Sequence, residues 1–160
     1  DLVFIGDADE IWNPKILKDD SFFKSDRWKL EQFVYAYYLN NRSSEWWEGT
    51  SVMPYKLIKE YPLDDLRAHD NHPRPIQRAP TFRIAGWHWT NMGGVEFIKR
   101  KMNSYSHQEF NYSQITDKIE KQMEENKDFI GRDFKFWVEE KDLPKYVLNN
   151  KERYAHLFKR

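Results

Sequence analysis

The chain has 160 residues, equal numbers of basic and acidic side chains (26 each) and no cysteine. The length favours one domain with a single core, and the zero net charge argues against a nonspecific nucleic-acid binder, which needs a basic surplus. We find no apolar run near the roughly 18 residues of a membrane span and no signal-peptide pattern. The lack of cysteine excludes disulfides and thiol catalysis and favours a reducing, cytoplasmic location.

The predicted elements begin with a strand. Leu2–Ile5 is a short apolar run ended by a glycine, which is typical of a strand buried on both faces of a parallel sheet. Pro14–Lys18 follows as a short helix opened by its proline. Tyr, Phe and Val predict a second strand over residues 33–39. A turn is expected over 46–50, and then a strand or short helix over 51–58.

The middle of the chain predicts a long loop before a strand and a helix. Residues 63–80 combine prolines, histidines and charges, and long loops inside compact domains are often functional. A strand is expected over 81–89 and a helix over 94–102. Alternating strands and helices predict an α/β fold in one domain over residues 1–160.

A second helix is predicted from a capping box and an apolar stripe. Ser106 at the N-cap and Glu109 three residues later would satisfy the free amides of the first turn. The apolar residues that follow repeat every four positions, and these are Ile115, Ile119 and Met123. This helix is expected to end near residue 126, and a last helix is expected around 151–158.

The first strand is followed at once by carboxylates, in Asp7-Ala8-Asp9-Glu10. Ligands of open α/β sheets bind beyond the carboxyl ends of strands. Carboxylates this close repel one another unless a cation compensates, and hard cations such as Mg²⁺ and Mn²⁺ prefer oxygen ligands. In extended backbone Asp7 and Asp9 project to one side, so they can share one ion. The alternative is a solvated acidic turn.

Two enzyme classes use such an acidic pair. In phosphohydrolases the first aspartate is the nucleophile, although haloacid-dehalogenase-type enzymes carry Thr or Val where this chain has Ile11. In glycosyltransferases the pair holds a metal bound to a nucleotide diphosphate. The seven tryptophans suit the second class, because a flat aromatic face stacks on a sugar. A carbohydrate-binding protein without enzymatic activity would use the same tryptophans.

Several motifs in order resemble glycosyltransferase family 17. They are Asp7-Ala8-Asp9-Glu10-Ile11 with Asn13-Pro14, Trp47-x-Gly49-Thr50, Gly86-Trp87-His88-Trp89 with Gly93-Gly94-x-Glu96, Ser104-Tyr105-Ser106-His107-x-Glu109, and Leu143-Pro144-Lys145-Tyr146-Val147-x-Asn149. This is the family of the β-1,4-mannosyl-glycoprotein β-1,4-N-acetylglucosaminyltransferase. The resemblance implies a GT-A fold, a UDP-sugar donor, a glycan acceptor, Mn²⁺ or Mg²⁺, and inversion at the anomeric carbon. GT-A enzymes place a nucleotide-binding βαβ portion before the acidic pair. The chain is therefore expected to be either the later part of such a domain or a shortened domain that has lost its uridine pocket.

The resemblance also assigns the metal and donor residues. Asp7 and Asp9 would hold the metal and the donor diphosphate, with His88 as the third ligand and His107 as the second choice. A lone histidine on a strand is equally typical of a core residue. Glu10 would tune the metal ligands from behind them. The backbone at Gly49 and Thr50 would approach the donor.

The catalytic base and the acceptor site are less closely defined by the sequence. Glu96, just after a glycine pair at a predicted helix start, would take the proton from the acceptor hydroxyl, or it serves the helix dipole. Glu48 and Asp70, both expected in loops, are the alternative bases. Aromatic side chains would stack on the acceptor sugar, and these are Trp46, Trp47 and Trp87. Neighbouring strand residues face opposite ways, so at most one of the adjacent pair is expected in the core.

Overall fold

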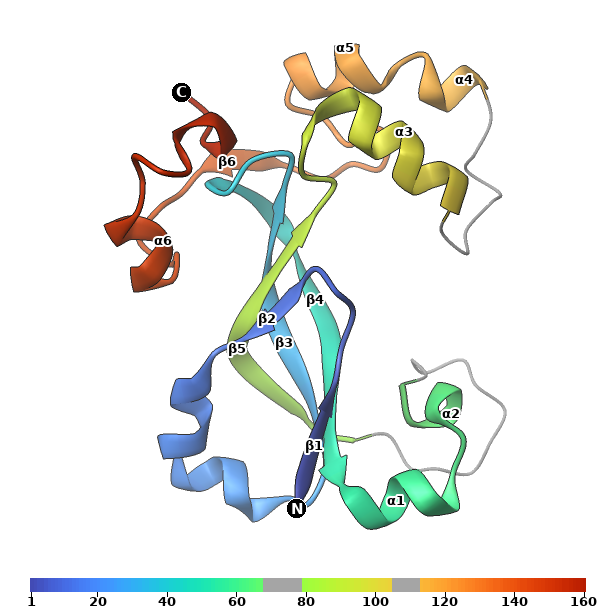
Figure 1. Cartoon of the computed structure of the whole chain (residues 1–160), viewed down its shortest axis with the longest axis vertical. Coiled ribbons are helices and arrows are strands. Elements are labelled where there is room, and N and C mark those ends of the chain that lie inside the picture. The colour runs from blue at the N-terminus through green and yellow to red at the C-terminus, as the bar shows by residue number, and fades with distance from the viewer. Residues whose placement is uncertain (68–78, 105–112) are drawn as a thin grey trace. The chain divides into compact units, whose positions relative to one another are not determined.

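The structure, a computed structural model, describes residues 1–67, 79–104 and 113–160. It is a mixed α/β protein whose six-stranded sheet has the order β1-β4-β3-β5-β2, with β6 paired to β4 (Figure 1). The strands are β1 (Leu2–Ile5), β2 (Glu10–Trp12), β3 (Trp28–Ala36), β4 (Asn41–Pro54), β5 (Thr81–Thr90) and β6 (Phe136–Val138). The chain divides into two compact units: unit 1 is 1–33 with 46–88, and unit 2 is 34–45 with 89–160.

The sheet of unit 1 is curled. β1 and β2 occupy the two edges of its five-strand path, yet only residues 6–9 join them. In a flat sheet those edges would be about 19 Å apart. The five steps from Ile5 to Glu10 cover at most about 17 Å even when fully extended, and this linker contains a turn. The two edges are therefore drawn toward each other, and the sheet is curled (Figure 1).

Short helices and an apolar cluster complete unit 1. The helices are η1 (Pro14–Lys18), η2 (Asp20–Lys24), α1 (Tyr55–Glu60) and α2 (Leu63–Arg67). The Asn13 and Asp19 side chains cap the two 3₁₀ helices by accepting from the amides of Lys15 and Ser21. The buried apolar residues are Ile16, Phe22, Leu30, Val52 and Ala85.

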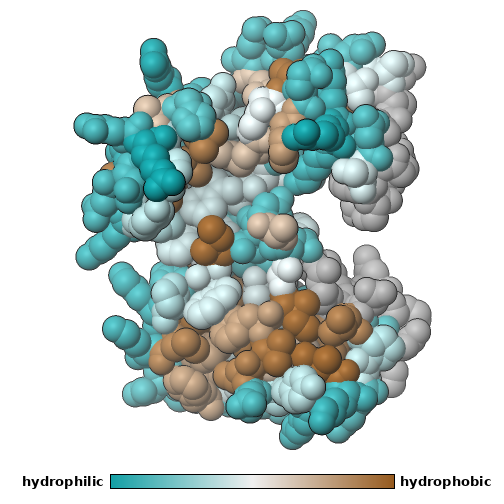
Figure 2. Space-filling view, in the orientation of Figure 1, coloured by the Kyte–Doolittle hydropathy of each residue, from teal (hydrophilic) through white to brown (hydrophobic). Residues whose placement is uncertain are grey.

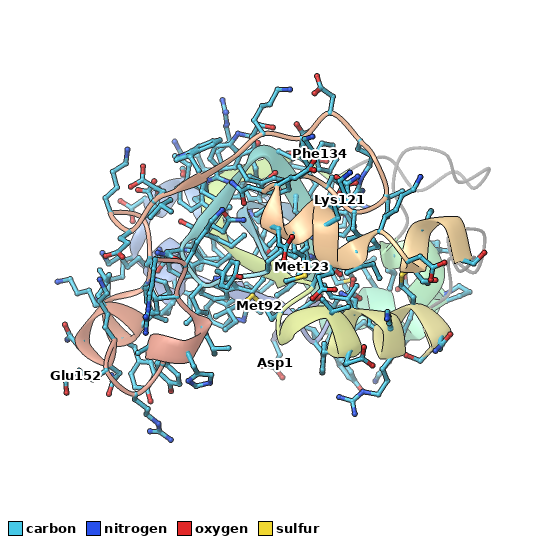
Figure 3. All side chains as sticks on the ribbon, turned by 90° about the horizontal axis from the view of Figure 1, so that it is seen from above. Asp1, Met92, Lys121, Met123, Phe134 and Glu152 are labelled. Carbon is cyan, nitrogen blue, oxygen red and sulfur yellow. The ribbon has the colours of Figure 1, made fainter. Side chains whose placement is uncertain are left out.

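Unit 2 is built around an apolar cluster to which three of its helices contribute side chains. Its helices are α3 (Gly94–Ser104), α4 (Ser113–Thr116), α5 (Ile119–Glu124), α6 (Lys145–Asn149) and η4 (Ala155–Leu157). The cluster is Ala36, Tyr37, Ile98, Met102, Ile115, Ile119 and Phe129, with Met123 packed against it. Figure 3 shows α3 and α5 together with Met123 on α5. None of the helices within the described ranges is long and apolar enough to cross a membrane.

The turn between β3 and β4 places a tyrosine inside unit 2. Tyr37 has a left-handed backbone with a φ of 70° and is 3% exposed. Its hydroxyl donates to the carbonyl of Lys127 (2.9 Å) and accepts from the amide of Phe129 (3.0 Å). Burial, and secondly the charge of Asp128, raises the pKa of this hydroxyl above its ordinary value. The Tyr37 hydroxyl therefore makes two hydrogen bonds to the backbone within apolar surroundings.

Several predicted elements are confirmed. β1, the helix at Pro14–Lys18, β5 and α3 all form, and β5 and α3 are slightly longer than predicted. The apolar stripe of the second predicted helix is also confirmed, because its residues lie against the core of unit 2. That helix is broken into α4 and α5, however, and its predicted capping box at Ser106 and Glu109 lies outside the described residues. Residues 151–158 contain only the single turn η4.

Three predictions for the strands are wrong. The expected turn at 46–50 lies inside β4, a continuous strand of 14 residues. The expected strand over 33–39 begins earlier and ends at Ala36, because the next residue has a left-handed backbone. The parallel sheet is also wrong, since β1 pairs antiparallel with β4 and Leu2, opposite Pro54, is 42% exposed. Figure 2 shows apolar surface in the region where β1 lies.

Candidate functional site

The carboxylate cluster forms a tight turn that buries its last member. The amide of Glu10 donates to the carbonyl of Asp7 at 3.1 Å, so the backbone reverses instead of running extended. The Asp7 side chain is exposed, that of Asp9 is 30% exposed, and that of Glu10 is only 1% exposed. The expectation that the two aspartates project to one side of extended backbone is therefore wrong. Glu10 instead enters the interior of the curled sheet.

The Glu10 carboxylate is held by donors from two other strands. Trp47 Nε1 donates to Oε1 at 2.6 Å, and Thr50 Oγ1 donates to Oε2 at 2.7 Å. Gln32 Nε2 donates to Thr50 Oγ1 at 2.9 Å and lies 3.5 Å from Glu10 Oε2. Hydrogen bonds to a charged acceptor are about twice as strong as neutral ones. The network thus offsets much of the cost of burying this charge.

Two glycines leave the space that the carboxylate fills. A Cβ on Gly49 would lie 2.4 Å from Glu10 Oε1, and one on Gly6 would lie 2.7 Å from Oε2. Trp47, Gly49 and Thr50 all border the same carboxylate, so strict alternation of side chains does not hold along this part of β4. The space beside Gly49, predicted to face the donor, is occupied by Glu10 and the Trp47 indole.

His88 lies between two carboxylates. In the antiparallel pair of β2 and β5 it is directly opposite Glu10. Its Nδ1 is 4.0 Å from Glu10 Oε1, and its Nε2 is 3.9 Å from Asp9 Oδ2. The residue is 8% exposed, and its ring lies against the ring of Trp47 with centroids 4.9 Å apart. The structure thus brings together His88 and Asp9, two of the three predicted metal ligands.

The other metal assignments have less support from the geometry. His107, the second choice of ligand, lies outside the described residues. Within residues 1–67, 79–104 and 113–160, no group of three or more acidic, histidine or cysteine side chains is placed to hold a metal ion. Asp9 and His88 form a pair, and Mg²⁺ is commonly held by one or two carboxylates with waters and substrate phosphates at the remaining positions.

The three predicted acceptor tryptophans lie in different surroundings. Trp46 is 40% exposed, and its ring lies against Phe33 with centroids 4.9 Å apart. Trp47 is half-buried and holds Glu10, which agrees with the prediction that at most one of the adjacent pair lies in the core. Trp87 is 9% exposed and lies opposite Ile11 in the strand pair.

Two of the three candidate bases lie among the described residues. Glu48 is in β4 instead of the expected loop, and it accepts from Thr81 Oγ1 at 2.7 Å. Glu96 belongs to unit 2, where its side chain is 89% exposed in the first turn of α3, 3.4 Å from Lys99. That position suits the helix-dipole interpretation. Asp70 lies outside the described residues.

Sequence reasoning missed Gln32, which is fully buried in the Glu10 network. Its signal was present, because Trp28, Leu30 and Gln32 alternate along one face of β3, and a polar residue there breaks an apolar series. The Oε1 atom of Gln32 is buried and accepts no hydrogen bond. A buried amide with a spare acceptor is unusual in a purely structural core.

Comparisons with known proteins identify no relative: no family model, curated protein or solved structure matches this chain.

Proposed function

We propose that the chain is a metal-dependent glycosyltransferase that moves a sugar from a UDP-sugar to a hydroxyl of a glycan, with inversion. The donor sugar proposed first is N-acetylglucosamine, following the resemblance to family 17. The observation that carries the proposal is the 3.9 Å separation of Asp9 Oδ2 and His88 Nε2, two atoms from residues far apart in the sequence. The GT-A architecture belongs to the proposal as well.

The spacing of this pair suits one divalent cation. Ligands of an octahedral Mg²⁺ at about 2.1 Å stand about 3 Å apart when adjacent and about 4.2 Å apart when opposite. The observed separation of 3.9 Å lies between these two values and nearer the second. One oxygen and one imidazole nitrogen also suit Mn²⁺. The Asp9 side chain is 30% exposed, so solvent reaches this carboxylate.

The proposed chemistry divides between the cation and the protein. The cation, when bound, neutralises the diphosphate leaving group. Asp9 and His88 would hold it, with Asp7 reaching it from the same turn. A carboxylate would accept the proton of the acceptor hydroxyl, and Glu48 is the described candidate within unit 1.

The test compares Asp9→Asn with a matched control, Asp133→Asn, whose side chain is 91% exposed in unit 2. Mn²⁺ and UDP binding are measured by calorimetry, and release of UDP from UDP-N-acetylglucosamine is measured with and without chelator. We expect Asp9→Asn to weaken Mn²⁺ binding by at least about 10-fold and to abolish chelator-sensitive UDP release, while the control matches the wild type. Equal behaviour of both variants contradicts the proposal. So does turnover of a phosphate monoester without UDP-sugar binding, which would indicate a phosphohydrolase.

One observation favours a second candidate, carbohydrate binding without catalysis. Trp46 and Phe33 form an exposed aromatic pair on unit 1, and such faces stack on sugars. Binding of an oligosaccharide that is lost in Trp46→Ala, unaffected by chelator, and not accompanied by UDP affinity would favour this function. Trp137→Ala is the matched control, because Trp137 is an exposed tryptophan of unit 2.

A further inference from the structure

We propose that Glu10 is a positioning residue for His88. Its buried carboxylate keeps the imidazole proton on Nδ1, so that the lone pair of Nε2 points toward Asp9 and is available to a divalent cation. The part that concerns the cation rests on the proposed function. The part that concerns the tautomer of His88 stands by itself.

The strand register brings the two side chains together. Glu10 and His88 are directly opposite each other in the antiparallel pair of β2 and β5, so they project from the same face of the sheet. Glu10 Oε1 lies 4.0 Å from Nδ1, slightly beyond hydrogen-bond distance. At this range the charge still distinguishes an N–H pointing at it from a lone pair pointing at it.

The carboxylate cannot rotate away from the histidine without losing its own donors. Trp47 fixes Oε1 at 2.6 Å and Thr50 fixes Oε2 at 2.7 Å. Gly6 and Gly49 form close walls around it, since a Cβ on either would collide with a carboxylate oxygen. Both oxygens of the carboxylate accept from donors, so Nδ1 faces a fixed group that acts as an acceptor.

Asp9 has the opposite influence, because its carboxylate faces Nε2 at 3.9 Å and favours a proton there. Burial decides between them, since the Glu10 side chain is 1% exposed and the Asp9 side chain is 30% exposed. At 4 Å, two unit charges interact by about 4 kcal/mol at an effective dielectric of 20 and by about 1 kcal/mol in water. The interaction of an N–H dipole is smaller but depends on the dielectric in the same direction. The buried carboxylate therefore dominates.

A carboxylate behind a histidine is the arrangement that orients metal-binding imidazoles in general, and removing it typically weakens metal binding 10- to 100-fold. Here Glu10 would set the tautomer before the cation arrives. The competing arrangement for the same three side chains is an imidazolium held between two carboxylates, with no cation.

The experiment measures the tautomer directly. The five histidines are labelled with ¹⁵N, and His88→Gln identifies the resonances of His88. Spectra are recorded in alkaline solution for the wild type, Glu10→Gln and Glu31→Gln, the last being a control carboxylate of β3 whose side chain is 13% exposed beside Arg83. Mn²⁺ affinity is measured by calorimetry on the same proteins.

We expect His88 to be protonated on Nδ1 in the wild type and in Glu31→Gln. In Glu10→Gln the population protonated on Nε2 should rise, and the Mn²⁺ affinity should fall by about 10-fold or more. If Glu10→Gln does not fold, Glu10→Asp keeps the charge but withdraws it from Nδ1, and a smaller change in the same direction is expected.

An unchanged tautomer in the Glu10 variants overturns the proposal, and so does a wild-type His88 that carries protons on both nitrogens in alkaline solution. A third result separates the two proposals. If the wild type binds no Mn²⁺ but the tautomer still depends on Glu10, the proposed function fails while the positioning role stands.

Discussion

The two compact units fill their interiors in different ways. Unit 2 packs apolar side chains from its helices around Ile98 and Ile119, each fully buried. Unit 1 has an apolar cluster too, but beside it the curled sheet encloses Glu10, Gln32 and His88. Charged side chains are buried in unit 2 as well, at Arg42 and Asp128. Packing alone explains the apolar cluster of unit 2, whereas a buried carboxylate lies beside the cluster of unit 1.

Burying apolar surface and burying a carboxylate change the free energy of folding in opposite directions. Burying apolar surface stabilises a fold by about 25 cal/mol per Å². Burying a carboxylate costs several kcal/mol, which hydrogen bonds and nearby charges only partly offset. The apolar cluster of unit 2 therefore needs no explanation beyond stability. The polar interior of unit 1 contributes least to the stability of the fold, which is why we place the proposed function there.

The largest effect on stability is expected in the apolar interior. Ile119→Ala removes a fully buried side chain from the cluster of unit 2 and leaves a cavity. We expect a loss of about 2 to 5 kcal/mol in the free energy of unfolding, measured by urea denaturation. Val138→Ala is the control, because Val138 is 51% exposed on β6. A loss below about 1 kcal/mol for Ile119→Ala would contradict the packing of α5 described here.

The next effect concerns the buried charge. Trp47→Phe keeps an aromatic ring but removes the N–H that donates to Glu10 at 2.6 Å. Because a buried charged acceptor loses a donor, we expect a cost of about 1.5 to 3 kcal/mol by urea denaturation. Trp46→Phe alters the neighbouring, exposed indole and should cost less than about 0.5 kcal/mol. Equal losses in both variants would mean that Glu10 is not held as the structure shows.

Much of the fold could be predicted where the signal is local. The apolar run of β1, the aromatic pattern of β5, and the four-residue spacing of Ile115 and Ile119 each lie within a few residues of the element they predict. β4 was missed for a physical reason. Gly49 reads as a turn signal, but its missing Cβ serves to admit a carboxylate from β2. No window around that glycine contains this information.

The candidate site, like the fold, could be predicted only in part. The resemblance of the motifs predicted that Asp9 and His88 belong together, and they are 3.9 Å apart. The sequence did not indicate that the third acidic residue of the cluster would be the buried one. That depends on the curl of the sheet, which follows from β1 and β2 lying at opposite edges with a four-residue linker. Local patterns do not determine strand order.

The smallest effect concerns the buried Tyr37 hydroxyl of unit 2, and it depends on pH. Tyr37→Phe removes a buried hydroxyl that donates to Lys127 and leaves the amide of Phe129 without this acceptor. We expect a loss of about 1 kcal/mol near neutral pH. Tyr146→Phe, at a tyrosine that is 60% exposed, is the control and should lose less.

The sign of the pH dependence follows from burial, which raises the pKa of Tyr37 in the folded protein above its ordinary value of 10.0. Above that value the unfolded chain releases the proton while the folded chain retains it, so the folded state loses stability as the pH rises. Phenylalanine has no proton to lose. The advantage of the wild type over Tyr37→Phe should therefore shrink above about pH 10 and then reverse, as measured by urea denaturation across the alkaline range. A constant difference between the two proteins would show that the hydroxyl ionises equally well in both states, which the buried environment of Tyr37 does not allow.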